Sequence, residues 1–284
     1  MSKNRPFSSK LKAVIYGLLA FFVSLLLFVL SIFVTLEATF FNPDFIISKM
    51  DSTNYFVEKE AEVKQSLIDL GYASGLNEEF FENVVDPVMI HDDTEKYLED
   101  YYSGESNQVD KTAFKQQFNT ALDEYIKANN IQNVNGSSRE YLVNKAAGIY
   151  ASSLQLPLFI TLSTYVHVAR SWMPYIILIT AVFLIILCLI IILTNKWKHR
   201  ALKYLCCATL GATLTVGIIP AVVFISGYIG KMNITSRALY VLMVECANSI
   251  FISLAFCALF FLVVSAGLFF WYKKKRNKVT GGNH

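Results

Sequence analysis

Long apolar runs dominate the pattern of hydrophobic and polar positions along the chain. Four of them, residues 11–36, 174–194, 204–229 and 247–272, are long enough to cross a bilayer, which takes about 20 apolar residues in a helix. Apart from Lys12 near the start of the first run, none contains a charged side chain. Because charges are strongly disfavoured in the middle of a membrane helix, the pattern predicts four transmembrane helices.

The segments between these runs differ sharply in charge. Residues 1–10, 195–203 and 273–284 contain Lys and Arg but no Asp or Glu, which places them in the cytoplasm by the positive-inside rule. Residues 37–173 hold 21 of the 22 acidic residues, against ten basic ones. We therefore expect 37–173 and the short loop 230–246 to lie outside, with both termini inside. The basic segments could also contact anionic lipid headgroups.

Within residues 37–173 the polar pattern is helical. Phe56, Val63 and Leu67 recur at spacings that fit one helix face, and strand-like alternation is weak. The Asp86-Pro87 pair is expected to end a short helix. The predicted helix starts are Asn42, Ser52, Asn77, Asp110 and a position near Ser138. The prediction is an all-helical domain of about five helices.

The stretch Leu154–Ala169 is apolar, interrupted by Pro157, and too short to span a bilayer. One interpretation is a buried helix that packs on the domain and continues into the second span. The other is a segment that lies at the outer membrane interface.

Composition narrows the class of protein. Of the 284 residues, 54% are hydrophobic and 17% are charged, and the mean hydropathy is +0.43, which excludes a disordered chain and disfavours a purely soluble one. None of the five cysteines falls in 37–173, so the domain has no internal disulfide. That pattern fits a bacterial plasma membrane protein better than an animal cell-surface protein.

The densest polar cluster is His91-Asp92-Asp93-Thr94-Glu95. Its side chains His91, Asp92, Asp93 and Glu95 are weak candidates for a divalent cation, which prefers several carboxylate oxygens. We favour another interpretation, in which Asp92 and Glu95 form a capping box at the start of a helix. No metal is therefore predicted.

Catalytic motifs are missing from the sequence. It has no Gly-rich phosphate loop, no G-x-S-x-G and no H-E-x-x-H, and its four histidines lack zinc spacing. The interiors of the spans contain no ionisable group of the kind that coupled carriers place there. We expect neither an enzyme nor a cofactor, and nothing points to nucleic acid.

Small residues recur at helical spacing within the spans, where they let membrane helices approach closely. We favour packing within one bundle over contact with a partner's helices. The residues are Gly17, Ser24 and Ser31 on the first span, Cys207, Gly211, Thr215 and Gly217 on the third, and Ser249, Ser253 and Cys257 on the fourth. Thr213, Glu245 and Asn248 are candidates for a pore or its entrance, although Glu245 is expected to pair with Arg237 or Lys231.

The sequence thus predicts an all-α fold, a four-helix transmembrane bundle with an all-helical extracytoplasmic domain inserted between helices one and two. The predicted function is that of a non-catalytic cell-surface accessory, sensor or assembly subunit. The expected partners are membrane lipids and either another membrane protein or further copies of the chain. The alternatives are a channel or transporter subunit with an oligomeric pore, and a protein that handles lipids or other hydrophobic ligands.

Overall fold

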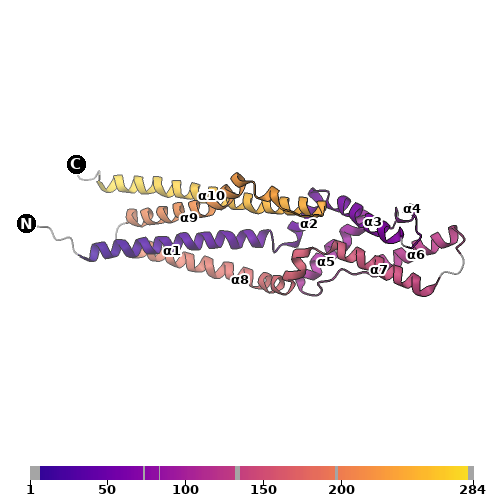
Figure 1. The fold of residues 1–284 in the computed structure, drawn as a ribbon. Helices are drawn as coiled ribbons and strands as arrows, with labels where there is room; N and C mark the ends of the chain where they lie inside the picture. The colour runs from indigo at the N-terminus through magenta and orange to yellow at the C-terminus, as the bar shows by residue number, and fades with distance from the viewer. Residues whose placement is uncertain (1–6, 73, 83, 132–134, 196–197, 281–284) are drawn as a thin grey trace, which may run out of the picture. The chain divides into compact units, whose positions relative to one another are not determined.

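The computed structural model describes residues 7–72, 74–82, 84–131, 135–195 and 198–280, and every regular element within them is a helix (Figure 1). This agrees with the predicted all-α class. Residues 1–6, 196–197 and 281–284 of the predicted cytoplasmic segments lie outside the described residues. The helices are α1 (Phe7–Ala38), α2 (Pro43–Ser52), α3 (Tyr55–Tyr72), α4 (Glu78–Phe81), α5 (Pro87–Ser103), α6 (Thr112–Ala128), α7 (Gly136–Leu154), α8 (Pro157–Thr194), α9 (Lys198–Ser226) and α10 (Arg237–Thr280).

Four of these helices are long and apolar enough to cross a membrane, as the sequence predicted. The apolar stretches are Leu11–Ala38, Tyr165–Thr194, Lys198–Ser226 and Arg237–Asn277. Two of the helices extend well beyond the predicted spans. Helix α8 begins at Pro157, where a proline is tolerated because the first turn has no intrahelical partner for its missing N–H. The stretch that contains Pro157 therefore continues into the second span as one helix, while the side-chain surroundings of 157–164 lie outside the described residues.

The chain divides into two compact units. The first, called the apolar unit, consists of the described residues of Met1–Thr39, Trp172–Lys231 and Ala247–His284. The second, called the acidic unit, consists of Phe40–Ser171 and Met232–Cys246. Residues 232–246, predicted as part of a short loop, thus group with the large polar segment, and α10 already begins at Arg237.

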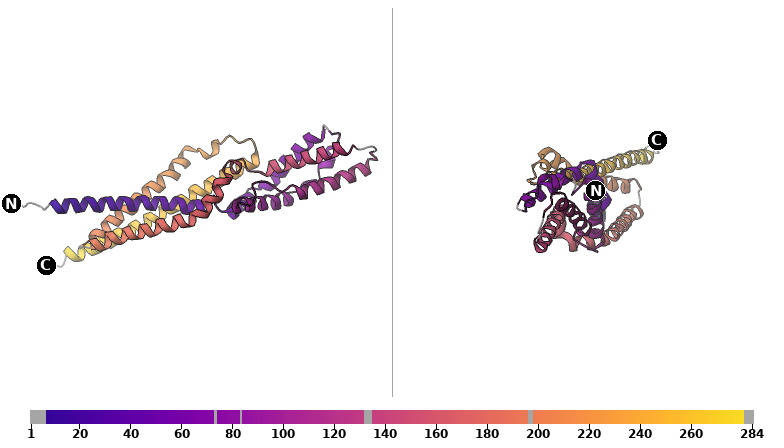
Figure 2. Two further views of the ribbon diagram at one scale, coloured as in Figure 1. Left: turned by 90° about the horizontal axis from the view of Figure 1, so that it is seen from below. Right: turned by 90° about the vertical axis from the view of Figure 1, so that its right-hand side faces the viewer.

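Among the described residues of the apolar unit, two clusters of buried side chains join its helices. Ala20 and Val23 of α1 pack with Leu187 and Ile191 of α8 and with alanines of α9, and α1 and α9 run side by side (Figure 1 and Figure 2). A second cluster joins Val216 of α9 to Leu254 and Ala258 of α10. Small side chains at these positions allow the close approach on which helix association within a bilayer depends.

The acidic unit has a core rich in aromatic side chains. Helix α3 packs against α5 and α7, and α6 packs against α7. The rings of Phe114 on α6 and Tyr150 on α7 are stacked at a centroid distance of 4.3 Å, and the Tyr150 hydroxyl donates to Asp93 on α5 at 2.6 Å. Buried Tyr hydroxyls usually find a hydrogen-bond partner, and this bond joins α7 to α5.

Several predicted helix starts are confirmed by the capping contacts. The Asn42 side chain accepts from the Asp44 N–H with Pro43 in the first turn, and Asn77 caps the short α4. Asp110 lies one residue before the N-cap position of α6, which is Lys111, and its carboxylate accepts from the Thr112 N–H at 2.9 Å. These side chains satisfy backbone donors that the first turn leaves unpaired.

One predicted start is wrong, and one predicted helix end is also a helix start. Ser52 is the last residue of α2, and α3 begins at Tyr55 after Asn54, whose positive φ turns the chain. Helix α7 begins at Gly136, capped by the Asn135 side chain, close to the predicted start near Ser138. Asp86-Pro87 starts a helix as well as following one, because Asp86 caps α5 by accepting from the Met89 N–H at 2.7 Å.

The start of α5 corrects the capping box. With the first turn at Pro87, Asp92 and Glu95 lie in the helix interior and cap nothing. The error arose because Asp-Pro disfavours helix at the Asp but also pre-organises the helix that follows it.

Candidate functional site

The start of α10 is held by a carboxylate of α3. The Ser236 hydroxyl lies 2.8 Å from each carboxylate oxygen of Glu62, and the Ala238 N–H donates to Glu62 at 3.3 Å. Ser236 in turn accepts from the Leu239 N–H at 3.2 Å. A carboxylate at this position satisfies a free N–H and interacts favourably with the positive end of the helix dipole. Glu62 therefore caps α10 from another helix.

Beside Glu62 lies Lys59, which is only 4% exposed. Its Nζ is 3.0 Å from Glu62 Oε2. Partial burial raises the pKa of Glu62, but the hydrogen bonds from Ser236, Lys59 and Ala238 outweigh it and hold this pKa below its ordinary range. The Ser236 hydrogen bond and the neighbouring Lys59 thus keep Glu62 ionised where it caps α10.

Two further ion pairs join the same elements. Lys49 of α2 lies 3.4 Å from Glu245, and Glu58 of α3 lies 3.7 Å from Arg237. This corrects the expected pairing of Glu245 with Arg237 or Lys231, since the cation comes from α2. Each exposed pair contributes little alone, but together they align the first turns of α10 with α2 and α3. These contacts are called the α10 dock, made of Lys49, Glu58, Lys59 and Glu62 with Ser236, Arg237, Ala238 and Glu245.

The α10 dock was not among the predicted sites, although one signal for it is in the sequence. Lys59 falls in the same apolar stripe as Phe56, Val63 and Leu67, all of which are buried. A lysine on the buried face of an amphipathic helix calls for a carboxylate partner. Sequence spacing alone does not show which helix this carboxylate caps, because that depends on how the helices pack.

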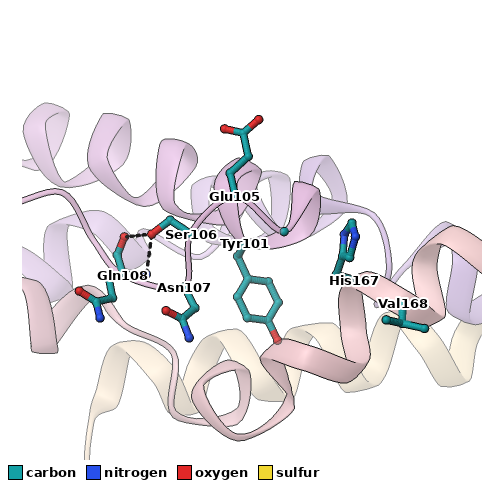
Figure 3. A pocket seen from close by; sticks show the side chains of 8 residues that line it. Tyr101, Glu105, Ser106, Asn107, Gln108, His167 and Val168 are labelled. Atoms are coloured by element: carbon teal, nitrogen blue, oxygen red, sulfur yellow. Dashed lines mark hydrogen bonds between the residues drawn. The ribbon is translucent and has the colours of Figure 1, made fainter.

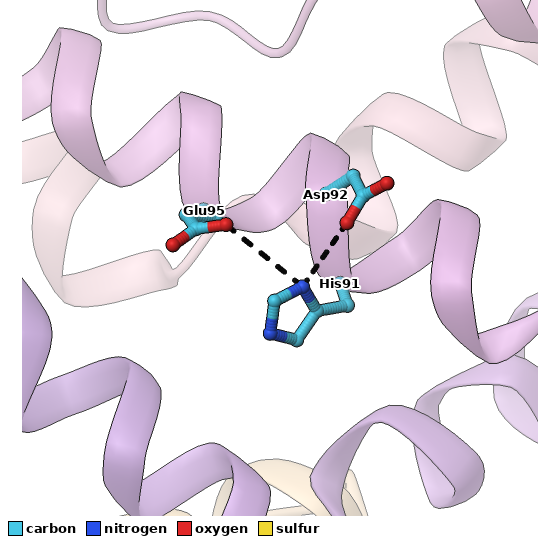
Figure 4. Close-up of side chains that lie close together, drawn as sticks. All are labelled: His91, Asp92 and Glu95. Carbon is cyan, nitrogen blue, oxygen red and sulfur yellow. Dashed lines mark hydrogen bonds and ion pairs between the residues drawn. The ribbon is translucent and has the colours of Figure 1, made fainter.

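The structure brings three of the four candidate metal ligands together. His91 Nδ1 lies 3.2 Å from Asp92 and 4.0 Å from Glu95 (Figure 4), and its Nε2 lies 3.6 Å from Asp51 of α2. Asp93 points elsewhere and accepts from Tyr150. A ring nitrogen and two carboxylate oxygens within 4.8 Å could hold a divalent cation, but both carboxylates are exposed, and exposed acidic groups are common without an ion. We assign this cluster no metal.

A polar cavity of about 480 Å³ lies between the turn after α5 and the part of α8 that belongs to the acidic unit. Ser106 and Gln108 bond to each other on one side, and His167 lies on the other (Figure 3). His167 Nδ1 is 3.4 Å from the Tyr102 carbonyl, and its ring rests on Gly104, whose φ is +82°. His167 is thus a hydrogen-bonded side chain that packs against the end of α5.

The predicted small-residue positions separate into two groups. Gly211 lies against Ser24, since a Cβ on Gly211 would come within 2.7 Å of the Ser24 hydroxyl, and Gly217 faces Ala258. Ser31 is buried and bonds to its own helix. Other positions face outward or open space: Cys207 and Thr215 are exposed, and a Cβ added to Gly17 would meet nothing within 4 Å. Ser249, Ser253 and Cys257 are half-buried.

The candidate pore residues do not share one environment. The Thr213 hydroxyl donates to the Thr209 carbonyl of its own helix at 2.9 Å. Glu245 belongs to the α10 dock, and Asn248 is half-buried on α10.

Comparison with known proteins adds no relative, because no family model matches the chain and no curated protein or solved structure matches it either.

Proposed function

We propose that this chain is a non-catalytic multi-pass membrane protein that acts as an accessory, sensor or assembly subunit, with its acidic unit on the extracytoplasmic side. The apolar helices and the confinement of acid-free basic segments to one predicted side support this orientation. The predicted cytoplasmic loop 195–203 is too short to form a signalling domain. We expect a signal to pass sideways, to membrane helices of a partner.

The α10 dock is the observation that carries the proposal. Glu62 and Lys59 of α3 hold the first turn of a helix that continues without a break to Thr280. Because α10 is one helix, the residues held by α3 and the fourth predicted span belong to the same element. In this proposal, binding on the acidic unit reaches the membrane through α10.

Capture of the partner tests this proposal. Cells that express the tagged full chain are treated with a membrane-impermeant amine crosslinker, and the chain is extracted in mild detergent and analysed by mass spectrometry. We expect the same membrane protein in each preparation. Glu62→Gln should reduce its recovery, whereas Glu60→Gln should not, since Glu60 pairs with Lys64 within α3.

Two results would contradict the proposal. One is a preparation that returns only this chain. The other is solute flux through proteoliposomes that contain the chain alone, abolished by Thr213→Leu. That flux would assign the chain to the channel and transporter class instead.

A further inference from the structure

The acidic unit has an apolar groove where the C-terminal ends of α3 and α6 meet the start of α7. Its volume is about 680 Å³, within the range of ligand pockets. The buried side chains of Leu76, Leu122 and Leu142 form the floor. In Figure 1, α3, α6 and α7 converge in this part of the unit.

Large apolar side chains remain exposed at the edge of this groove. Tyr141 is 67% exposed and Ile131 is 44% exposed, and both line the opening. Apolar surface around a concave site lowers the free energy when a partner covers it, at roughly 25 cal/mol per Å² of area removed from water. The groove therefore favours an occupant that is itself apolar on one side.

The charged residues of the segments that carry the groove indicate which polar groups its occupant should have. The segments that bear the groove, 69–82, 122–131 and 137–142, contain seven carboxylates and two cations. One of the two cations, Arg139, is already paired with Asp123 at 2.7 Å. Arg139 is the one charged side chain among the described lining residues, whereas the segments that carry the groove have a net charge of −5. Cationic groups that flank an apolar contact would be attracted to this net negative charge.

We propose that this groove binds a segment of another extracytoplasmic protein in which apolar side chains are flanked by Lys or Arg. The inference rests on the proposed function, because it needs the acidic unit outside the cell. A second copy of the chain is disfavoured as the occupant, since its acidic unit carries the same negative charge. Anionic lipid headgroups are disfavoured for the same reason.

Peptide binding to the purified full chain in nanodiscs tests the chemistry of the groove. The probe is a fluorescent 16-residue peptide of Leu and Lys, compared with one in which Glu replaces Lys. We expect the Lys peptide to bind about 10-fold or more tightly than the Glu peptide. Tyr141→Ser and Ile131→Ser should each weaken binding by about fivefold or more. Val88→Ser is the matched control, because Val88 is 69% exposed on α5 outside the groove and should leave affinity unchanged.

Equal binding of the two peptides, or equal loss in the Tyr141 and Val88 variants, would overturn the proposal. So would concentration-dependent dimers that the Lys peptide dissociates, since a second copy would then occupy the groove.

Photo-crosslinking in cells separates this inference from the proposed function. A photoreactive phenylalanine is placed at position 141 or, as control, at position 88. Capture at 141 of a segment with apolar residues flanked by Lys or Arg supports the groove. Capture of a partner at 88 but not at 141 refutes the groove and leaves the proposed function standing. No capture at either position counts against both.

Discussion

Glu62 of α3 accepts hydrogen bonds from Ser236 and Ala238 at the start of α10. Replacing it by Gln keeps the shape but removes the charge that faces Ser236, Ala238 and the buried Lys59. Loss of a charge-assisted contact and of the partner of a buried cation should weaken the α10 dock by about 1–2 kcal/mol. Hydrogen exchange of residues 237–242 in the full chain should then become about 5- to 30-fold faster.

The control and the pH dependence make that prediction specific. Glu60→Gln on the same helix should leave exchange of α10 unchanged. Because the folded pKa of Glu62 is lowered, its stabilising contribution is complete above the ordinary glutamate value of 4.5 and is lost as pH falls through the lower folded value. Acid should thus loosen the wild-type dock and have less effect on Glu62→Gln. Unchanged exchange in that variant would show that the cap stabilises nothing.

Helical periodicity explains which candidate ligands meet and which do not. Successive residues are rotated by about 100°, so His91 and Glu95 share a face while Asp93 points to the opposite side. That much could be predicted from the sequence. The approach of Asp51 from α2, and the bond from Tyr150 to Asp93, depend on how helices pack and could not.

At the scale of elements, the end of α5 depends on a glycine. Gly104 has a φ of +82°, and a Cβ there would lie 2.9 Å from the His167 ring. Gly104→Ala should cost about 1–2 kcal/mol from the left-handed conformation alone, plus the displacement of His167. The thermal unfolding midpoint of the full chain in detergent, followed by circular dichroism, should fall by several degrees.

A second glycine provides the matched comparison. Gly148 lies within α7 with open space around its Cα, so Gly148→Ala should raise stability by about 0.4–1 kcal/mol. Gly104→Ala/His167→Ala should recover part of the loss, the part due to the clash. If Gly104→Ala and Gly148→Ala had the same thermal unfolding midpoint, the left-handed conformation at Gly104 would not contribute to stability.

The small residues of the spans give a prediction that separates internal packing from partner contact. Gly211→Leu would drive a side chain into Ser24 of α1 and should lower the melting temperature, with a cost of about 1–3 kcal/mol. Gly17→Leu meets open space and should leave the melting temperature unchanged. If Gly17→Leu nevertheless reduced partner capture, its stripe would be a surface for another protein's helix. Equal destabilisation by the two variants would contradict the observed α1–α9 packing.

Helix starts were predictable where a capping side chain and a proline agreed, as at Asn42-Pro43. They were not predictable where one dipeptide is compatible with both the end of a helix and the start of the next. Asp86-Pro87 fits the end of one helix and the beginning of the next, and only the position of Asp86 relative to the Met89 N–H decides between them. Because α5 begins at Pro87, Asp92 lies inside the helix and does not cap its start.

At the scale of the whole molecule, four apolar helices were predictable because bilayer thickness sets a minimum apolar length. Hydropathy placed the start of the fourth at residue 247, whereas α10 begins at Arg237. The charged residues Arg237 and Glu245 lower the hydropathy of these first turns, so the predicted span did not include them. Both charges are met by partners on α3 and α2, so they belong to the acidic unit's own packing.

The orientation of the chain in the membrane is the last prediction, and the proposed function depends on it. A fluorescent protein fused after His284 should fluoresce in the cytoplasm, and an epitope inserted at the exposed Asn107 should bind antibody on cells whose wall has been loosened. Replacing the five cations of 273–284 by Gln should raise the fraction of inverted chains, because Lys and Arg near the spans set orientation. Replacing five exposed carboxylates of residues 37–173 by their amides should not, since acidic residues contribute little to that choice. An Asn107 epitope reached only after the membrane is permeabilised would place the acidic unit and its groove inside, where no extracytoplasmic partner could reach them.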